Sequence, residues 1–125
     1  MATIALTEQM FSETVSRDGI VMVDFWAAWC PPCRAFGPVF EAASADHPDI
    51  FFGKVDTEAE PGLSGSLGIM SIPTLMIFRD GVLVFEQPGA LSAAALAKLI
   101  GAVRELDMDE VRRELAATAK AGETS

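Results

Sequence analysis

The stretch that most constrains this chain runs from residue 21 to residue 40, where an apolar strand leads into a Cys-x-x-Cys tetrad and then into an apolar-faced helix. Cys30 and Cys33 are the only cysteines of the sequence, and Pro31 and Pro32 separate them. A strand that delivers two cysteines at this spacing to the start of a helix is typical of dithiol–disulfide chemistry. The stretch therefore predicts a redox-active cysteine pair.

The spacing of the two cysteines suits reversible bond formation. Helical residues three positions apart have Cβ atoms about 5–6 Å from each other, and a disulfide needs about 3.5–4.5 Å, so a small adjustment closes the bond. Unpaired N–H groups and the helix dipole favour negative charge on Cys30, which lowers the pKa of its thiol. We expect Cys30 to attack a partner disulfide and Cys33, lying deeper and protonated until needed, to resolve the mixed disulfide.

Asp24 is an acid in the middle of the apolar strand. Burial penalises its ionised form, so its pKa is expected to rise. A carboxyl group held near neutrality can take the proton from Cys33 and return it in the reverse reaction. Lys54, in a second predicted buried strand, is the expected charge partner. The alternative is a carboxylate satisfied by Lys54 and water, with no part in catalysis.

Other interpretations of the cysteines fit less well. A structural disulfide would close a loop of only four residues, which stabilises by about 2 kcal/mol, and a reducing cytosol would remove it. A zinc site lacks ligands, because the one histidine, His47, stands beside a proline at a predicted helix end, where a solvated side chain is expected. A metal or iron–sulfur site shared between two chains stays open. We expect no metal in a single chain.

Size and charge limit the class of protein. The 125 residues are 50% hydrophobic and 22% charged, which indicates one globular domain. A formal net charge of −9 argues against nucleic acid and anionic membranes as partners. The N-terminus has no basic segment followed by a long apolar one, and charges interrupt every apolar run before the roughly 20 residues of a membrane span. We expect a cytoplasmic monomer.

The hydrophobic periodicity predicts alternating helices and strands, then a hairpin and a closing helix. Strands 20–25 and 50–55 should be parallel, because a helix of more than a dozen residues, containing Pro38, connects them. The result is an α/β fold of three layers, α/β/α, with a central mixed sheet. The other expected elements are helix 8–16, a short helix within 56–68, hairpin strands 72–78 and 82–85, and a helix capped by Ser92.

The chain is expected to divide into a domain of residues 1–106 and a helical extension of residues 107–125 with a frayed end. Asp107, with Glu110 three residues later, predicts the start of that extra helix. The extension is either an added surface helix or a docking helix for a partner.

Several short motifs stand in a fixed order along the chain. They are Phe25 to Arg34 around the cysteines, Pro38, Lys54-Val55-Asp56, Ser71-Ile72-Pro73-Thr74, Asp80-Gly81 and Gly89-Ala90. In this order and spacing they resemble the thioredoxin family, over residues 3–106.

The resemblance implies a thioredoxin fold and a protein-disulfide reductase with no bound cofactor, whose electrons come from NADPH through a thioredoxin reductase. The expected roles are electron transport and cell redox homeostasis, and the partners are the reductase and disulfide-containing proteins. The resemblance further implies that Pro73 is cis and that Trp26 packs against the cysteine loop. The resemblance also implies that the substrate groove is lined by Trp29, Ile72, Pro73, Gly89 and Ala90.

The sequence departs from the family pattern at Pro31, where the family usually has glycine. Two consecutive prolines remove two N–H groups from the first helical turn and stiffen it, which affects the reduction potential and the choice of partner. Two alternatives therefore stay open. One is a thioredoxin-like binding module without turnover, and the other is a disulfide oxidase or isomerase with a shifted potential.

Overall fold

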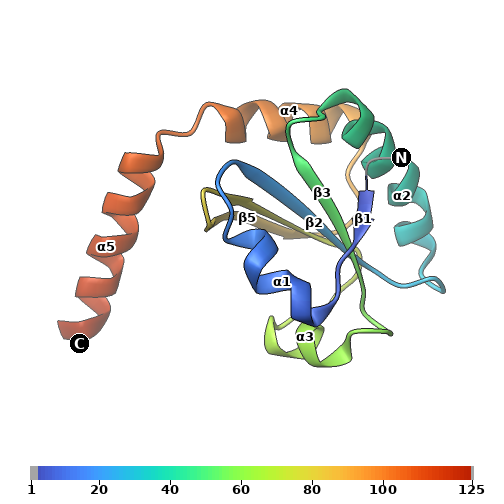
Figure 1. The fold of residues 1–125 in the computed structure, drawn as a ribbon, viewed down its shortest axis with the longest axis horizontal. Coiled ribbons are helices and arrows are strands. Elements are labelled where there is room, and N and C mark those ends of the chain that lie inside the picture. The colour runs from blue at the N-terminus through green and yellow to red at the C-terminus, as the bar shows by residue number, and fades with distance from the viewer. Residues whose placement is uncertain (1–2, 125) are drawn as a thin grey trace.

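The computed structural model describes the backbone of residues 3–124 and the side chains of residues 3–118. In this part of the chain a five-stranded sheet of order β1-β3-β2-β4-β5 carries helices on both faces (Figure 1). The strands are β1 (Thr3–Ala5), β2 (Ile20–Trp26), β3 (Phe51–Asp56), β4 (Thr74–Arg79) and β5 (Val82–Pro88). The helices are α1 (Glu8–Val15), α2 (Pro31–Asp46), α3 (Pro61–Ser66), α4 (Ala93–Arg104) and α5 (Met108–Thr124).

The middle strand of the sheet, β2, is parallel to β3 and antiparallel to β4. The predicted parallel pairing of its segment with residues 50–55 is confirmed. The hairpin between β4 and β5 turns at Asp80 and Gly81, whose φ angles are +52° and +82°. Positive φ at both positions matches the right-handed twist of the flanking strands. The mixed sheet and the three-layer arrangement are those expected from the sequence.

Each face of the sheet carries its own apolar core, which is why β2 is apolar at nearly every position. One core packs under α1 and α3, and the other under α2 and α4 (Figure 1). The buried residues of the first are Leu6, Phe11, Val15, Val21, Val23, Phe25, Val55, Leu63, Met76 and Phe78. Those of the second are Met22, Phe36, Phe40, Ile50, Phe52, Leu75, Ile77, Leu96, Ile100 and Val103.

The structure differs from the sequence-based elements at several boundaries. Strand β1 was not predicted, and it pairs in parallel with β3 at one edge of the sheet. Pro38, in contrast, lies inside α2, as expected. Strand β4 begins one residue after Pro73, because proline has no N–H for the ladder. Strand β5 runs on to Pro88, past a register shift between Ile77 and Phe78 of β4.

The last helix, α5, follows the end of α4 and descends beside the sheet, on the side of the turn between β4 and β5 (Figure 1). The Asp107 Oδ1 atom accepts the N–H groups of Asp109 and Glu110, at 3.0 and 3.2 Å, as expected of a helix start. Buried Met108 and a 3.8 Å ion pair between Arg112 and Asp80 connect α5 to the sheet. The backbone of α5 is helical to Thr124, and of the segment expected to fray at its end residue 125 lies outside the described residues. Within them, no helix has both the length and the apolarity that crossing a membrane requires.

Candidate active site

Cys30 is the N-cap of α2, in extended conformation, and forms a disulfide with Cys33 across a Cα–Cα distance of 5.2 Å. Pro31 and Pro32 occupy the first two helical positions and carry no N–H. The first available amide of the helix is therefore that of Cys33, and it donates to the Cys30 Sγ at 3.3 Å. The next, that of Arg34, bonds to the Cys30 carbonyl. One backbone N–H of the first helical turn, that of Cys33, thus donates to the Cys30 sulfur.

The environment of the two sulfurs corrects one expectation. Cys30 and Cys33 are equally buried, each 3% exposed, so the idea that Cys33 lies deeper is wrong. What separates them is their surroundings. The Cys30 Sγ lies 3.6 Å from the carbonyl oxygen of Ile72, and the following Ile72–Pro73 bond is cis, as the resemblance implied. Trp26 and Ile72 pack against the cysteines, so the expected packing of Trp26 is present.

Two further loops meet at this point. The Gly89 N–H donates to the Pro73 carbonyl at 2.7 Å, which joins the end of β5 to the cis-proline loop. Gly89 has φ of +102°, a conformation that favours glycine. Trp29, next to Cys30, is 64% exposed, and its indole Nε1 donates to Glu58 at 2.6 Å. Of the expected groove residues, Ile72, Pro73 and Gly89 are joined by direct contacts, and Ala90 follows as an exposed neighbour.

Asp24 is completely buried in β2, on the face that α2 covers, and neither of its carboxylate oxygens has a hydrogen-bond partner. Burial disfavours its ionised form and raises its pKa to about 7, while the positive charge of Lys54 acts in the opposite direction. The sequence-based expectation of a raised pKa thus agrees with the burial. A pKa near neutrality suits a group that both accepts and returns a proton.

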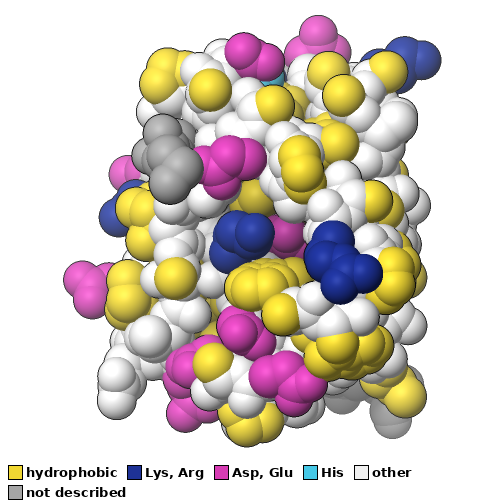
Figure 2. All heavy atoms as spheres, turned by 90° about the vertical axis from the view of Figure 1, so that its right-hand side faces the viewer, with side chains coloured by type: hydrophobic (Ala, Val, Ile, Leu, Met, Phe, Trp, Pro, Cys, Tyr) yellow, Lys and Arg dark blue, Asp and Glu magenta, His cyan; other side chains and the backbone are white. Residues whose placement is uncertain are grey.

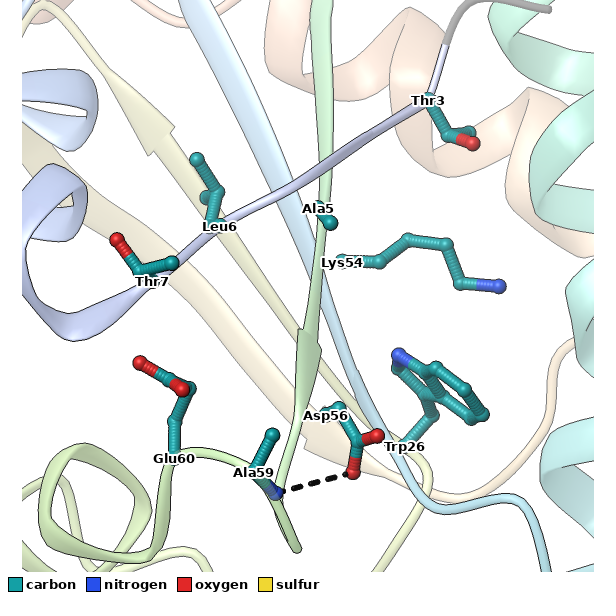
Figure 3. Close-up of a pocket in the computed structure, with 9 residues that line it drawn as sticks. All are labelled: Thr3, Ala5, Leu6, Thr7, Trp26, Lys54, Asp56, Ala59 and Glu60. Atoms are coloured by element: carbon teal, nitrogen blue, oxygen red, sulfur yellow. Dashed lines mark hydrogen bonds between the residues drawn. The ribbon is translucent and has the colours of Figure 1, made fainter.

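Lys54 lies directly opposite Asp24 in the parallel pair of β2 and β3. None of the salt bridges among the described residues includes it, and its Nζ lies 4.9 Å from the ring centroid of Trp26. The side chain extends along a hollow of about 460 Å³ over β1 and β3 (Figure 3). Besides Trp26 and Lys54, the hollow is lined by Thr3, Ala5, Leu6, Thr7, Asp56, Ala59 and Glu60.

The comparisons with known proteins agree with this geometry. Residues 2–102 match the family model described as Thioredoxin. The chain belongs to the thioredoxin family. It is 56% identical to "Putative thioredoxin 2" of Streptomyces coelicolor over 115 residues. The aligned region covers 92% of this chain and 86% of the relative. It is 39% identical over 104 residues to the thioredoxin of Alicyclobacillus acidocaldarius. That aligned region covers 79% of this chain and 99% of the relative.

Among solved structures, the thioredoxin of Malassezia sympodialis (Mala s 13) superimposes with a TM-score of 0.72 at 30% identity, over 81% of this chain and 92% of that one. The thioredoxin fold is thereby shown. With its cysteine pair in a disulfide at the start of α2, this member of the family is a thiol–disulfide oxidoreductase that reduces protein disulfides.

Sequence reasoning missed two acids of this thioredoxin, Glu58 beside Trp29 and Glu41 on α2. Glu58, which holds the Trp29 indole, lies in the loop after β3. Since the carboxyl ends of parallel strands meet at one edge of a sheet, the pairing of β2 with β3 already placed this loop beside the cysteines. Glu41 on α2, with a buried Oε1 atom, gives no signal in the sequence, because it stands beside the apolar stripe of its helix.

The one histidine of the sequence, His47, lies at the opposite end of α2 from the cysteines. His47 is the C-cap of α2, and its Nδ1 lies 3.0 Å from a guanidinium nitrogen of Arg104, so the ring nitrogen must be the acceptor. The described residues contain no group of three or more His, Cys, Asp or Glu side chains that could hold a metal ion. Thioredoxins need no bound cofactor for this chemistry.

Proposed function

We propose that Cys30 is the nucleophile and Cys33 the resolving thiol of disulfide reduction. The Cys30 thiolate attacks one sulfur of the partner disulfide, so that a mixed disulfide forms and the other partner sulfur leaves as a thiolate. Cys33 then loses its proton and attacks the Cys30 sulfur. The Cys30–Cys33 bond forms, the mixed disulfide breaks, and the second partner sulfur leaves as a thiolate. The partner has then gained two electrons from this chain, and its two thiolates become thiols with the proton that Cys33 gave up and one proton from water. The N-cap position of Cys30, with the Cys33 N–H on its sulfur, carries this assignment.

Asp24 is the proposed proton acceptor for Cys33, and Lys54 its charge partner. The support is a buried carboxyl with a pKa of about 7 on the sheet face that α2 covers, in the strand whose Trp26 packs against the cysteine cluster. Pro31 and Pro32 contribute by fixing the first turn of α2, since each has a locked φ and lacks a donor.

The substrate is proposed to dock as an extended segment across the cis-proline loop. Trp29, Ile72, Pro73, Gly89 and Ala90 form this surface. The Ile72 carbonyl at 3.6 Å from the Cys30 sulfur and the hydrogen bond from Gly89 to Pro73 support it, because they bring two loops to the reacting sulfur.

We infer the cellular setting from the same chemistry. Electrons are supplied by NADPH through a thioredoxin reductase, which together with disulfide-containing proteins forms the set of partners. The chain is a cytoplasmic monomer acting in electron transport and cell redox homeostasis, where reducing conditions keep the dithiol available. Nucleic acid and membranes are not partners of a surface with a net charge of −9. Residues 1–106 form the thioredoxin domain, and residues 107–125 are a helical extension of it.

Trapping of substrates tests the roles of the two cysteines. Cys33→Ser should accumulate a mixed disulfide with a disulfide-containing protein, because no thiol remains to resolve it, whereas Cys30→Ser should form none. Non-reducing gel electrophoresis of each variant with insulin measures the adduct. Equal trapping by both variants would overturn the assignment. In the reductase-coupled assay, wild-type turnover of insulin with NADPH separates a reductase from a binding module, which shows none.

A further inference from the structure

Glu41 of α2 is a partly buried acid that no step above uses. Its Oε2 atom accepts a hydrogen bond from the hydroxyl group of Thr3 in β1. Its Oε1 atom is buried and has no hydrogen-bond partner. A carboxylate oxygen removed from water without a partner is unfavourable. Such an oxygen therefore attracts any cation that can reach it.

The cation that lies against the same helix is Lys54. Its Nζ lies 3.9 Å from the position that a Cβ on Gly37 would occupy, so the ammonium rests against α2. Gly37 and Glu41 are four residues apart and share one side of that helix. Thr3, which binds Glu41, stands two residues before Ala5, the partner of Lys54 in the β1–β3 pair. Figure 3 shows the side chains of Thr3 and Lys54 extending toward the same side of β1 and β3.

The surface agrees with this placement. Viewed from the side of β1 and α2, basic side chains lie next to acidic ones around a hollow (Figure 2). Lys54 is half-buried, and the described residues contain no salt bridge that includes it. Lys54 thus stands opposite Asp24 of β2 and rests its ammonium against α2, the helix that carries Glu41, and both acids have buried oxygens without a partner.

We propose that Glu41 is a positioning residue, which competes with Asp24 for the Lys54 ammonium and so sets how readily Asp24 gives up its proton. While Asp24 holds a proton, the ammonium is drawn to Glu41. When Asp24 ionises, the flexible stem of Lys54 lets the ammonium turn toward it. The electrostatic coupling among Glu41, Lys54 and Asp24 does not depend on the proposed role of Asp24 in catalysis. Only the expected effect on turnover rests on that role.

Other charged groups on the surrounding elements are less able to take this part. Arg34 of α2 and Lys98 of α4 are exposed. The Asp56 Oδ1 atom of β3 already accepts the N–H groups of Glu58 and Ala59, at 2.9 and 3.4 Å. On β4, the residue opposite Asp24 is the uncharged Leu75. Glu60, which lines the same hollow as Lys54, accepts the N–H of Glu8 at 2.7 Å. The thiol of Cys33 does not titrate in the disulfide form.

The test is the pKa of Asp24 in the oxidised protein, read by NMR from the carbon of its carboxyl group. Glu41→Gln keeps the side-chain shape and the acceptor for Thr3 but removes the charge. It should lower the pKa of Asp24 by about half a unit or more, which is about a threefold loss of proton affinity. Glu13→Gln, the same change at an exposed site on α1 across the sheet, should leave that pKa unchanged. An unchanged value in Glu41→Gln would overturn the proposal.

A second background separates competition for Lys54 from simple repulsion between the two acids. In Lys54→Met the effect of Glu41→Gln should shrink to less than half, because no ammonium remains to be released. A full-sized effect there would also overturn the proposal. The pH profile of reductase-coupled turnover should move with the pKa in Glu41→Gln. If the pKa moves and the profile does not, the coupling stands and the proton-shuttle role of Asp24 fails.

Discussion

Replacing Asp24 with asparagine should remove the loss of stability that burial of this acid causes as pH rises. Burial raises the pKa of the Asp24 carboxyl group from 3.8 to about 7. Between these values the unfolded chain has lost the proton and the folded chain keeps it, so folding binds a proton. The free energy of unfolding of the wild type therefore falls as pH rises through this window. The amide introduced by Asp24→Asn has no such titration.

The size of the effect follows from the shift. The rise from 3.8 to about 7 is roughly three pH units, and each is about 1.4 kcal/mol. The complete penalty is then about 4 kcal/mol, and the part that develops between about pH 5 and about pH 9 is about 3 kcal/mol. The amide of the variant is buried without partners as the acid was, but the cost of burying it does not depend on pH. The pH-dependent difference thus isolates the carboxyl group.

Urea unfolding of the two proteins in the disulfide form, where the cysteines do not titrate, measures this difference. The unfolding free energy of Asp24→Asn minus that of the wild type should increase by about 3 kcal/mol from about pH 5 to about pH 9. Asp46→Asn, at an exposed acid of α2, is the matched control and should give a nearly constant difference. A constant difference in Asp24→Asn as well would show that the carboxyl group titrates normally, and would refute the reasoning.

Two further predictions concern the helix start and the sheet. Pro31→Ala restores an N–H in the first turn of α2, which stabilises the Cys30 thiolate. The reduction potential, measured against glutathione, should rise by about 15 mV if the pKa of the Cys30 thiol falls by about half a unit. A lower potential would contradict this. Gly53→Ala would place a Cβ 2.5 Å from the Leu6 Cδ1 atom in a buried contact and should cost about 1–3 kcal/mol in denaturant unfolding. Gly101→Ala, in the interior of α4 with open space around it, should instead stabilise by up to about 1 kcal/mol, so equal effects would contradict the packing argument.

Much of the fold was accessible from the sequence because its elements are long and patterned. The unbroken apolar run of β2 indicated burial on both faces, and the period of Phe36, Val39 and Phe40 indicated the inward side of α2. Strand β1 gave no such signal. It has three residues, and it exists because β3 offers an open edge to pair with. Its absence from the prediction also hid the Thr3 contact to Glu41.

At the site, the sequence predicted the chemistry of single residues but not how residues from distant segments are arranged around them. The sequence predicted Cys30 at a helix start and a raised pKa for Asp24, since both follow from residues close in the chain. It did not predict that Lys54 would lie over Trp26 and against Gly37 without an ion pair to Asp24. It also wrongly expected Cys33 to be the deeper sulfur.

The sequence alone determined which chemistry is possible here, because the two thiols, the helix that follows the first of them and the acid in the preceding strand lie within a dozen residues of each other. Tertiary structure decided what surrounds them. The Ile72 carbonyl, the Glu58 carboxylate and the Lys54 ammonium come from segments far along the chain. Their positions depend on how the sheet twists and how side chains share the space beneath α2, which no local pattern encodes.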